Sequence, residues 1–447
     1  MSLRFGTDGV RGVANTELTP ELAVSLGRAA ARGLGSGSWL LGRDTRRSGP
    51  LLAAALAAGL ASEGATVADV GVLPTPGVAH LSAVHELPAA VISASHNPFA
   101  DNGIKLFAAG GHKLRDDTEK RLEASLAWLE REGIPGAADR PSGADIGVLA
   151  GAPEAWESYA DHLEADVLDG RALAGLRVVV DCAHGAASVV APRVLTALGA
   201  EVTVLNAEPD GTNINVGCGS NHPEALQQAV VARGAQVGLA LDGDADRVIA
   251  VDADGRVVDG DHILAVCAVD LHEQGRLAAA TVVVTVMTNL GFHHAMAERG
   301  ISVVETAVGD RAVLEALEDG GFSLGGEQSG HVIFRELATT GDGLLTGIRL
   351  VDAVARSGRP LADLASVMTR LPQVLRNVAV SRRDPALVEH LAGEIAAAEE
   401  ALAGTGRVLV RPSGTEPLVR VMVEAPTAEA AATVADRLVE AVERATA

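Results

Sequence analysis

The stretch Trp39–Ser93, WLLGRDTRRSGPLLAAALAAGLASEGATVADVGVLPTPGVAHLSAVHELPAAVIS, alternates short apolar runs with longer Ala- and Leu-rich segments. Runs 39–44, 66–70 and 89–93 have the length of buried strands, and segments 51–65 and 77–87 have the length of helices. Strands that alternate with helices favour a parallel sheet with helices on both faces. The stretch therefore predicts an α/β fold.

The same helix-to-strand unit recurs along the chain. A glycine that ends a helical segment is followed at once by an apolar run at Gly64, Gly199, Gly234 and Gly300. A Pro- and Gly-rich linker lies around 133–147, with weaker breaks near Asp252 and Arg370. From Gln373 onward the order is strand, helix, strand, strand, helix. We predict α/β domains at 1–145, 150–252 and 253–368, and an α+β domain at 371–447.

The composition limits the possible partners. The formal net charge of −22 on 447 residues argues against non-specific binding to nucleic acids or anionic membranes. The three cysteines form no CxxC pair, which fits a reducing compartment. The N-terminus lacks an apolar signal region, and no apolar segment is long enough to span a bilayer. We expect a cytoplasmic enzyme without nucleic-acid or membrane partners.

The first of four polar loops lies in AVISASHNPFADNGIKLF, residues 90–107. It is either a turn, in which Ser95 or Asn97 caps a helix, or a strand end that presents a serine oxygen at the carboxyl edge of a sheet. The residues alone do not decide between Ser93 and Ser95. Lys105 is one of three lysines in the chain, so we interpret it as functional rather than as a surface charge.

The second loop, DGDADR at 242–247, follows a strongly apolar run. Its alternating residues Asp242, Asp244 and Asp246 would lie on one side of an extended backbone. Three carboxylates so close repel one another unless a cation lies among them, and all-oxygen ligation favours Mg²⁺. The alternative is an acidic hairpin turn.

The remaining two loops contain groups that suit sugar and phosphate. In LGGEQSGHVIF, at 324–334, Glu327 and Ser329 can bond sugar hydroxyls, although Gly-Gly and Ser-Gly are also common in turns. In LVRPSGTEPLVRV, at 409–421, a guanidinium, two hydroxyls and the amides around Gly414 suit a phosphate dianion. A plain hairpin is the alternative.

Together, SASHNP (93–98), DGDADR (242–247), GGEQSGH (325–331) and RPSGTEP (411–417) resemble the α-D-phosphohexomutase superfamily in order and spacing. The similarity covers essentially the whole chain. FGTDGVRG (5–12), GRDTRRSG (42–49), GVLPTP (71–76) and GTNINVGCGS (211–220) are similar to the bacterial members that act on glucosamine phosphates.

The resemblance implies a fold and a reaction. The fold would be three related α/β/α domains with mixed sheets and a C-terminal, TATA-box-binding-protein-like α+β domain around a central cleft. The enzyme would be an isomerase that interconverts glucosamine 6-phosphate and glucosamine 1-phosphate, for UDP-N-acetylglucosamine and peptidoglycan precursors. It would use a bisphosphorylated sugar as intermediate and activator, with one Mg²⁺ per subunit, and be a monomer or homodimer.

The resemblance also implies residue roles. Ser95, before His-Asn-Pro, would be the phosphoserine, and Ser93 would only pack at the strand end. The serine phosphate and the three aspartates would hold Mg²⁺, and Glu327 and Ser329 would recognise the sugar. The other expected catalytic residues are Arg11, His96, Lys105 and His331. Arg247 and the Arg411, Ser413, Gly414 and Thr415 loop would bind the substrate's phosphate groups.

Three positions depart from the family pattern. Ala245 stands where glycine is usual, which would be costly only with a positive φ, and His184 and Asn221 replace the commoner Asn and Thr. The alternatives are a mutase for mannose or glucose phosphates and a silent relative that binds sugar phosphates. A two-metal serine phosphatase is disfavoured because it would want histidine ligands as well.

Overall fold

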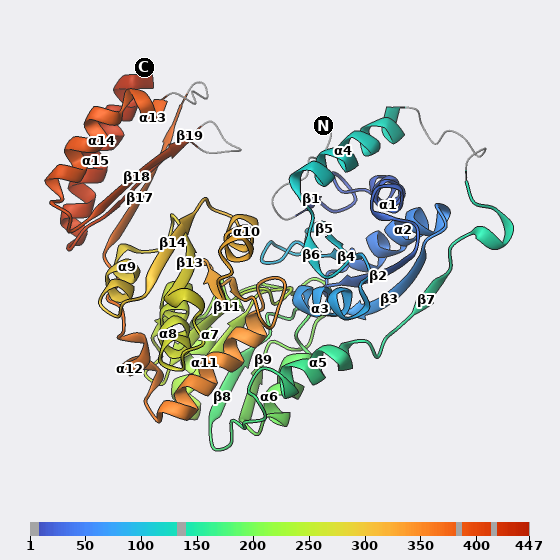
Figure 1. Cartoon of the computed structure of the whole chain (residues 1–447), viewed down its shortest axis with the longest axis horizontal. Coiled ribbons are helices and arrows are strands. Elements are labelled where there is room, and N and C mark those ends of the chain that lie inside the picture. Colours follow the sequence, from blue (N-terminus) through green and yellow to red (C-terminus); the bar gives the residue numbers. More distant parts are fainter. Residues whose placement is uncertain (1–8, 132–139, 381–386, 413–417, 447) are drawn as a thin grey trace. The chain divides into compact units, whose positions relative to one another are not determined.

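The computed structural model describes residues 9–131, 140–380, 387–412 and 418–446, which fall into two compact units. The first unit comprises 1–287 with 301–366, and the second comprises 288–300 with 367–447. Three sheets belong to the first unit and one smaller sheet belongs to the second (Figure 1).

The first sheet is mixed, and helices cover both of its faces. Leu41 lies in the core that the sheet shares with the first two helices, whereas the next residue, Gly42, leaves room for Val78 of the third helix. Thr19 caps the first helix and Pro20 opens it. The strand order is β1-β5-β4-β2-β3-β7, with β6 paired to β5. The elements are β1 (Val10–Val13), α1 (Pro20–Leu34), β2 (Ser38–Arg43), α2 (Gly49–Ser62), β3 (Thr66–Val72), α3 (Thr75–His85), β4 (Ala89–Ile92), β5 (Asp101–Ala108), β6 (His112–Lys113), α4 (Asp116–Arg131) and β7 (Leu149–Gly151).

The second and third sheets are also mixed, with strand orders β12-β11-β10-β8-β9 and β14-β13-β15-β16. The segment that contains the second sheet comprises α5 (Trp156–Ala165), β8 (Arg177–Asp181), α6 (Val190–Ala197), β9 (Glu201–Leu205), α7 (Glu224–Arg233), β10 (Val237–Leu241), β11 (Val248–Asp252) and β12 (Val257–Val258). The segment that contains the third sheet comprises α8 (Gly260–Glu273), β13 (Thr281–Thr285), β14 (Ser302–Thr306), α10 (Asp310–Gly320), β15 (Leu324–Gly326), β16 (Val332–Phe334), α11 (Gly343–Ser357) and α12 (Leu361–Ala365).

Three of the four polar loops occupy the same place in these three sheets. Each follows a strand that is parallel to one neighbour, and each leads into an antiparallel strand on the other side. The loops are β4–β5 with Ser95, β10–β11 with the aspartates, and β15–β16 with Glu327. Because ligands of α/β sheets bind at the carboxyl ends of parallel strands, the repeated topology explains why these loops can carry related parts of one site.

The second unit contains a three-stranded antiparallel sheet with the order β17-β19-β18. Buried aliphatic residues of its strands and helices form a separate core. Its elements are α9 (Leu290–Ala297), β17 (Gln373–Ala379), α13 (Leu387–His390), α14 (Ala392–Ala401), β18 (Arg407–Pro412), β19 (Leu418–Glu424) and α15 (Ala428–Thr446). The predicted terminal α+β unit with a hairpin is confirmed.

The predicted glycine repeat is also confirmed. Gly64, Gly199, Gly234 and Gly300 all have positive φ and precede β3, β9, β10 and β14 by two or three positions in the chain. Among the described residues, no helix combines the length and the apolar character needed to cross a membrane.

Candidate active site

Ser95 lies in the turn between β4 and β5 and is wholly buried. Its φ is +53°, a left-handed conformation that a residue with a side chain seldom adopts. The hydroxyl Oγ donates a hydrogen bond of 2.5 Å to Oδ2 of Asp242 and lies 3.3 Å from Nδ1 of His96. The β4–β5 turn and the aspartate loop therefore meet at this hydroxyl.

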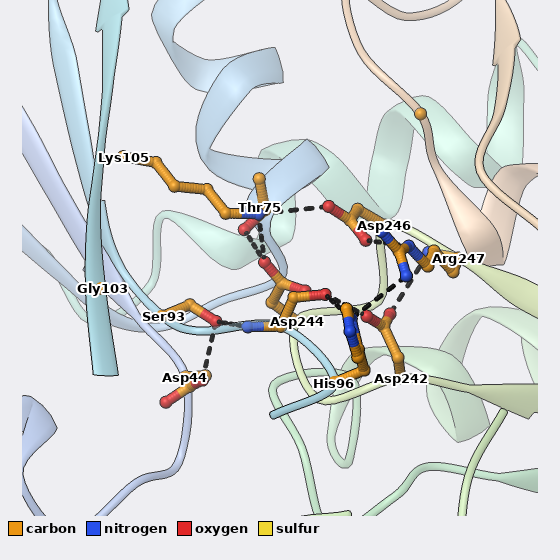
Figure 2. A network of polar contacts seen from close by, with 12 residues as sticks. Asp44, Thr75, Ser93, His96, Gly103, Lys105, Asp242, Asp244, Asp246 and Arg247 are labelled. Atoms are coloured by element: carbon orange, nitrogen blue, oxygen red, sulfur yellow. Dashed lines mark hydrogen bonds and ion pairs between the residues drawn. The ribbon is translucent and has the colours of Figure 1, made fainter. Parts of the chain in front are cut away.

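Ser93 faces a different set of partners. Its Oγ accepts a hydrogen bond of 2.9 Å from the main-chain N–H of Ser95 and donates one of 2.7 Å to Oδ2 of Asp44 (Figure 2). The expectation that Ser93 only packs at the strand end is wrong, because its hydroxyl fixes the backbone of Ser95. Of the two serines, Ser95 is the one whose hydroxyl bonds to the aspartate loop, through Asp242.

Asp242, Asp244 and Asp246 are buried, and one oxygen from each lies within 4.8 Å of the others. Within the described chain, Oδ1 of Asp244 and Oδ1 of Asp246 are buried without a hydrogen-bond partner. Burial, followed by the charges of Asp246 and Asp244, raises the pKa of Asp242 well above its usual range. An all-oxygen set with unsatisfied, mutually repelling carboxylates fits a hard divalent cation.

The backbone of this loop is not extended, contrary to the expectation from alternation. It turns, with the N–H of Ala245 donating 3.1 Å to the carbonyl of Asp242. Ala245 has a φ of +57°, so the replacement of the usual glycine carries a strain of roughly 1 kcal/mol. His184, another departure from the family pattern, also has a positive φ, of +49°.

Lys105 on β5 is 3 % exposed and lies among the aspartates. Its Nζ donates to Oδ2 of Asp244 at 2.9 Å and to Oδ2 of Asp246 at 3.1 Å (Figure 2). Burial opposes ionisation of Asp246, but Lys105, His331 and Arg247 hold the pKa of Asp246 well below its usual range. Thr75 donates to the same Asp244 oxygen at 2.6 Å. The structure thus brings Lys105 to the candidate metal ligands.

The side chains of His96 and Arg247 contact each other beside the Ser95 hydroxyl. Nη1 of Arg247 lies 3.1 Å from Nδ1 of His96. Burial, then the charges of Arg247 and Arg11, lower the pKa of His96 to about 4, so the imidazole is neutral at pH 7. Because a guanidinium only donates, Nδ1 accepts this hydrogen bond.

A cavity of about 580 Å³ lies beside these groups in the first unit. Oγ of Ser329 and Nε2 of Gln328 are buried there without a hydrogen-bond partner in the described chain. Its wall includes the predicted residues Arg11, Asp246, Arg247, Glu327, Ser329 and His331, together with Thr285, Gly309 and Asp310. The size suits a small polar ligand.

His331 lines this cavity with a defined orientation. Its Nε2 accepts a hydrogen bond of 3.1 Å from the N–H of Gly341, so the neutral ring carries its proton on Nδ1. That Nδ1 lies 3.9 Å from Oδ2 of Asp246. His331 therefore connects the cavity wall to the aspartate loop.

Arg411 lies on β18 in the second unit, directly opposite Arg420 of β19. Burial, and then the charge of Arg420, lower the pKa of Arg411. Two cations at facing positions of a hairpin repel each other, which favours an anion nearby. Ser413, Gly414 and Thr415 lie outside the described residues.

Two residues at the site, Asn215 and Arg46, were not predicted from the sequence. Asn215 donates from Nδ2 to the carbonyl oxygen of Ser95 at 2.9 Å, and the side chain of Arg46 donates to the same oxygen at 2.8 Å. Both lie in stretches, 42–49 and 211–220, that contributed to the resemblance only as motifs. A buried arginine that bonds main-chain carbonyls leaves no periodic signal in a sequence.

Family models match nearly all of the chain. The domain I, II and III models of phosphoglucomutase/phosphomannomutase, described as alpha/beta/alpha, match residues 2–131, 157–255 and 259–371, and the C-terminal domain model matches 375–441. The chain belongs to the phosphoglucomutase/phosphomannomutase family. The resemblance drawn from the loop motifs is confirmed, and the chain is accordingly an isomerase of the phosphohexomutase type.

Relatives of this family align over nearly the whole chain. Phosphoglucosamine mutases of Rhodococcus jostii and Symbiobacterium thermophilum are each 56 % identical to it, over 98 % and 95 % of both chains respectively. A solved phosphoglucomutase/phosphomannomutase family protein of Burkholderia thailandensis is 27 % identical, with a TM-score of 0.81 over 98 % of this chain and 97 % of that one. N-acetylphosphoglucosamine mutase of Aspergillus fumigatus, solved with GlcNAc-6P and magnesium, is 19 % identical and shares the fold, with a TM-score of 0.70 over 100 % of this chain and 96 % of that one.

Proposed function

We propose that the protein is a phosphoglucosamine mutase, which interconverts glucosamine 6-phosphate and glucosamine 1-phosphate. The observation that carries the proposal is the hydrogen bond from the Ser95 hydroxyl to Asp242, inside a buried group of three aspartates and Lys105. The substrate is inferred from the relatives named phosphoglucosamine mutase, which are about as long as this chain.

In the proposed reaction, Ser95 carries a phosphoryl group and gives it to the free hydroxyl of the bound sugar phosphate. The bond between phosphorus and Oγ of Ser95 breaks and a bond from phosphorus to the sugar oxygen forms. The sugar hydroxyl gives up its proton, and Oγ takes up one proton, so the step is balanced. Oδ2 of Asp242 orients the hydroxyl that results, because it accepts the hydrogen bond from Oγ. The bisphosphate then turns round and returns its other phosphoryl group to Oγ, so no net hydrolysis occurs.

Asp242, Asp244 and Asp246, with the serine phosphate, would hold one Mg²⁺. When bound, it would neutralise charge on the transferring phosphoryl group. Lys105 adds a fixed positive charge at the same place, through Asp244 and Asp246. Arg11 and Arg247 in the cavity wall would orient the phosphate that faces Ser95.

Glu327 and Ser329 would recognise the sugar. Oε1 of Glu327 accepts a hydrogen bond of 3.2 Å from the N–H of Gly309, which positions the carboxylate in the cavity wall. The buried, unsatisfied hydroxyl of Ser329 would gain a partner when a sugar hydroxyl binds. The loop that begins at Arg411 would bind the phosphate that is not reacting. In this proposal the chain has four domains, 1–145, 150–252, 253–368 and 371–447, and each supplies one of the four polar loops.

Initial rates with glucosamine, glucose and mannose 6-phosphates, each with a trace of the matching bisphosphate, test the substrate. We expect glucosamine 6-phosphate to give the highest kcat/KM. A clear preference for mannose or glucose 6-phosphate would instead assign the chain to the phosphomannomutase or phosphoglucomutase activity. Binding of these compounds without any turnover would indicate a silent relative.

A further inference from the structure

Arg46 lies behind the turn that carries Ser95 and is 1 % exposed. A guanidinium has five N–H donors, and each of those of Arg46 has an acceptor. One acceptor is the carboxylate of Asp44, three are main-chain carbonyls of the β4–β5 turn, and the last is the carbonyl of Asp101 at the start of β5. The contacts are Nε to Oδ2 of Asp44 at 2.8 Å, Nη2 to the carbonyls of Ser95 at 2.8 Å and Asn97 at 2.9 Å, and Nη1 to those of Asp101 at 3.1 Å and Pro98.

Both main-chain polar groups of Ser95, its N–H and its carbonyl oxygen, are hydrogen-bonded within one connected network. The N–H of Ser95 donates to Ser93, Ser93 donates to Oδ2 of Asp44, and that oxygen also accepts from Arg46. Arg46 in turn donates to the carbonyl of Ser95, which closes a ring of hydrogen bonds. Figure 2 shows the Ser93 hydroxyl between Asp44 and the main chain.

Ser95 needs this support because its backbone is in a sparsely populated conformation. A φ of +53° persists in a residue with a side chain only where the surroundings fix it. The same conformation directs Oγ toward Asp242 and away from Ser93, although the two serines are only two residues apart.

We propose that Asp44, Arg46 and Ser93 form a positioning network that holds Ser95 in the backbone conformation needed for phosphoryl transfer. The proposal rests on the proposed function and adds three residues that do not line the described cavity. Arg46 is its centre, since a lysine could supply one charge but not five donors in a plane. A misdirected nucleophile slows the chemical step more than it weakens substrate binding.

The test compares Arg46→Lys with Arg47→Lys, a matched control at the neighbouring arginine, whose side chain is exposed. For Arg46→Lys we expect kcat with glucosamine 6-phosphate to fall by about 50-fold or more, while KM changes by less than about 3-fold. Hydrogen exchange of the Ser95 amide should quicken about 10-fold or more, because its closed ring is broken. Arg47→Lys should match the wild type in all three measurements.

Ser93→Ala gives a second, milder test in case Arg46→Lys does not fold. It removes the acceptor of the Ser95 N–H and should lower kcat about 10-fold, again with little change in KM. Folded Arg46→Lys and Ser93→Ala proteins with kcat and Ser95 amide exchange within about 2-fold of the wild type would overturn the proposal. If the wild type itself turns over no hexose phosphate, the proposed function fails, while the exchange measurement still decides the positioning network.

Discussion

At the scale of single residues, Gly243 shows how closely two loops of the site approach each other. A Cβ at this position would lie 2.6 Å from the carbonyl oxygen of Ser95 and 2.9 Å from Nδ2 of Asn215. Both atoms belong to contacts that hold Ser95, so they cannot move without redirecting the serine. Gly243→Ala should therefore lower kcat about 100-fold and destabilise the protein by about 1–3 kcal/mol.

Initial rates and urea unfolding of Gly243→Ala would measure both effects. Gly37→Ala is the matched control, because a Cβ there meets no atom within 4 Å. Wild-type rates in Gly243→Ala would show that the Ser95 turn is not as tightly constrained as these distances indicate.

The sequence alone could not show which of the two serines, Ser93 or Ser95, faces the aspartate loop. Alternation along a strand puts residues two apart on one side, so it cannot separate Ser93 from Ser95. The left-handed φ of Ser95 turns its side chain away, and that angle depends on partners distant in sequence, such as Arg46 and Asn215. The grouping of Asp242, Asp244 and Asp246 was predicted, but through an extended backbone, whereas a turn produces it.

At the scale of elements, the β10–β11 loop is the candidate metal site. Asp244→Asn removes one negative charge from the three buried aspartates and should weaken Mg²⁺ binding by about 10-fold or more. Calorimetric titration with Mg²⁺ would measure the affinity. Asp254→Asn, on the exposed turn after β11, should leave the affinity unchanged. Equal Mg²⁺ affinities in the two variants would argue against the triad as the site.

The start of α11 gives a prediction about pH. Asp342 caps this helix through a hydrogen bond of 2.9 Å from the N–H of Leu345, and accepts one of 2.7 Å from Tyr159. Burial raises the pKa of Asp342 to about 6. The folded state therefore binds this proton more tightly than the unfolded chain, so the stabilisation is complete below about pH 4 and is lost as the pH rises through 6.

Asp342→Asn should remove this dependence. Between pH 4.5 and pH 7, the free energy of unfolding of the wild type should fall relative to that of the variant by about 2 kcal/mol. Urea unfolding of both proteins at the two pH values measures the difference, with the exposed Asp319→Asn as control. A difference that stays constant with pH would contradict the raised pKa.

The order of elements was largely predictable because it depends on local signals. Thr19 and Pro20 are such a signal at the start of α1, and the predicted glycines at 64, 199, 234 and 300 do precede strands. The antiparallel partners β5, β11 and β16 were harder to predict, since an apolar run does not reveal the direction of its neighbour. Their placement is what puts three loops at equivalent positions in three sheets.

At the scale of the whole molecule, the mutase cycle requires a second phosphate site that works in both orientations of the intermediate. Arg411, which faces Arg420 on the sheet of the second unit, is the described residue proposed for it. Arg411→Ala should raise KM for the sugar phosphate about 10- to 100-fold, because a charge-assisted contact to phosphate is lost. Steady-state kinetics would measure this, and Arg376→Ala, at an exposed position of β17, should leave KM unchanged. A KM in Arg411→Ala equal to that of the wild type would remove Arg411 from the phosphate site.

The proposed reaction depends on Ser95, which carries the phosphoryl group before the first transfer and after the second. Mass spectrometry of peptides, after incubation of the protein with glucosamine 1,6-bisphosphate and Mg²⁺, tests this role most directly. We expect one phosphoryl group on Ser95, its loss when glucosamine 6-phosphate is added, and no phosphorylation in Ser95→Ala. Phosphate on another residue, or full turnover by a verified Ser95→Ala protein, would contradict the account.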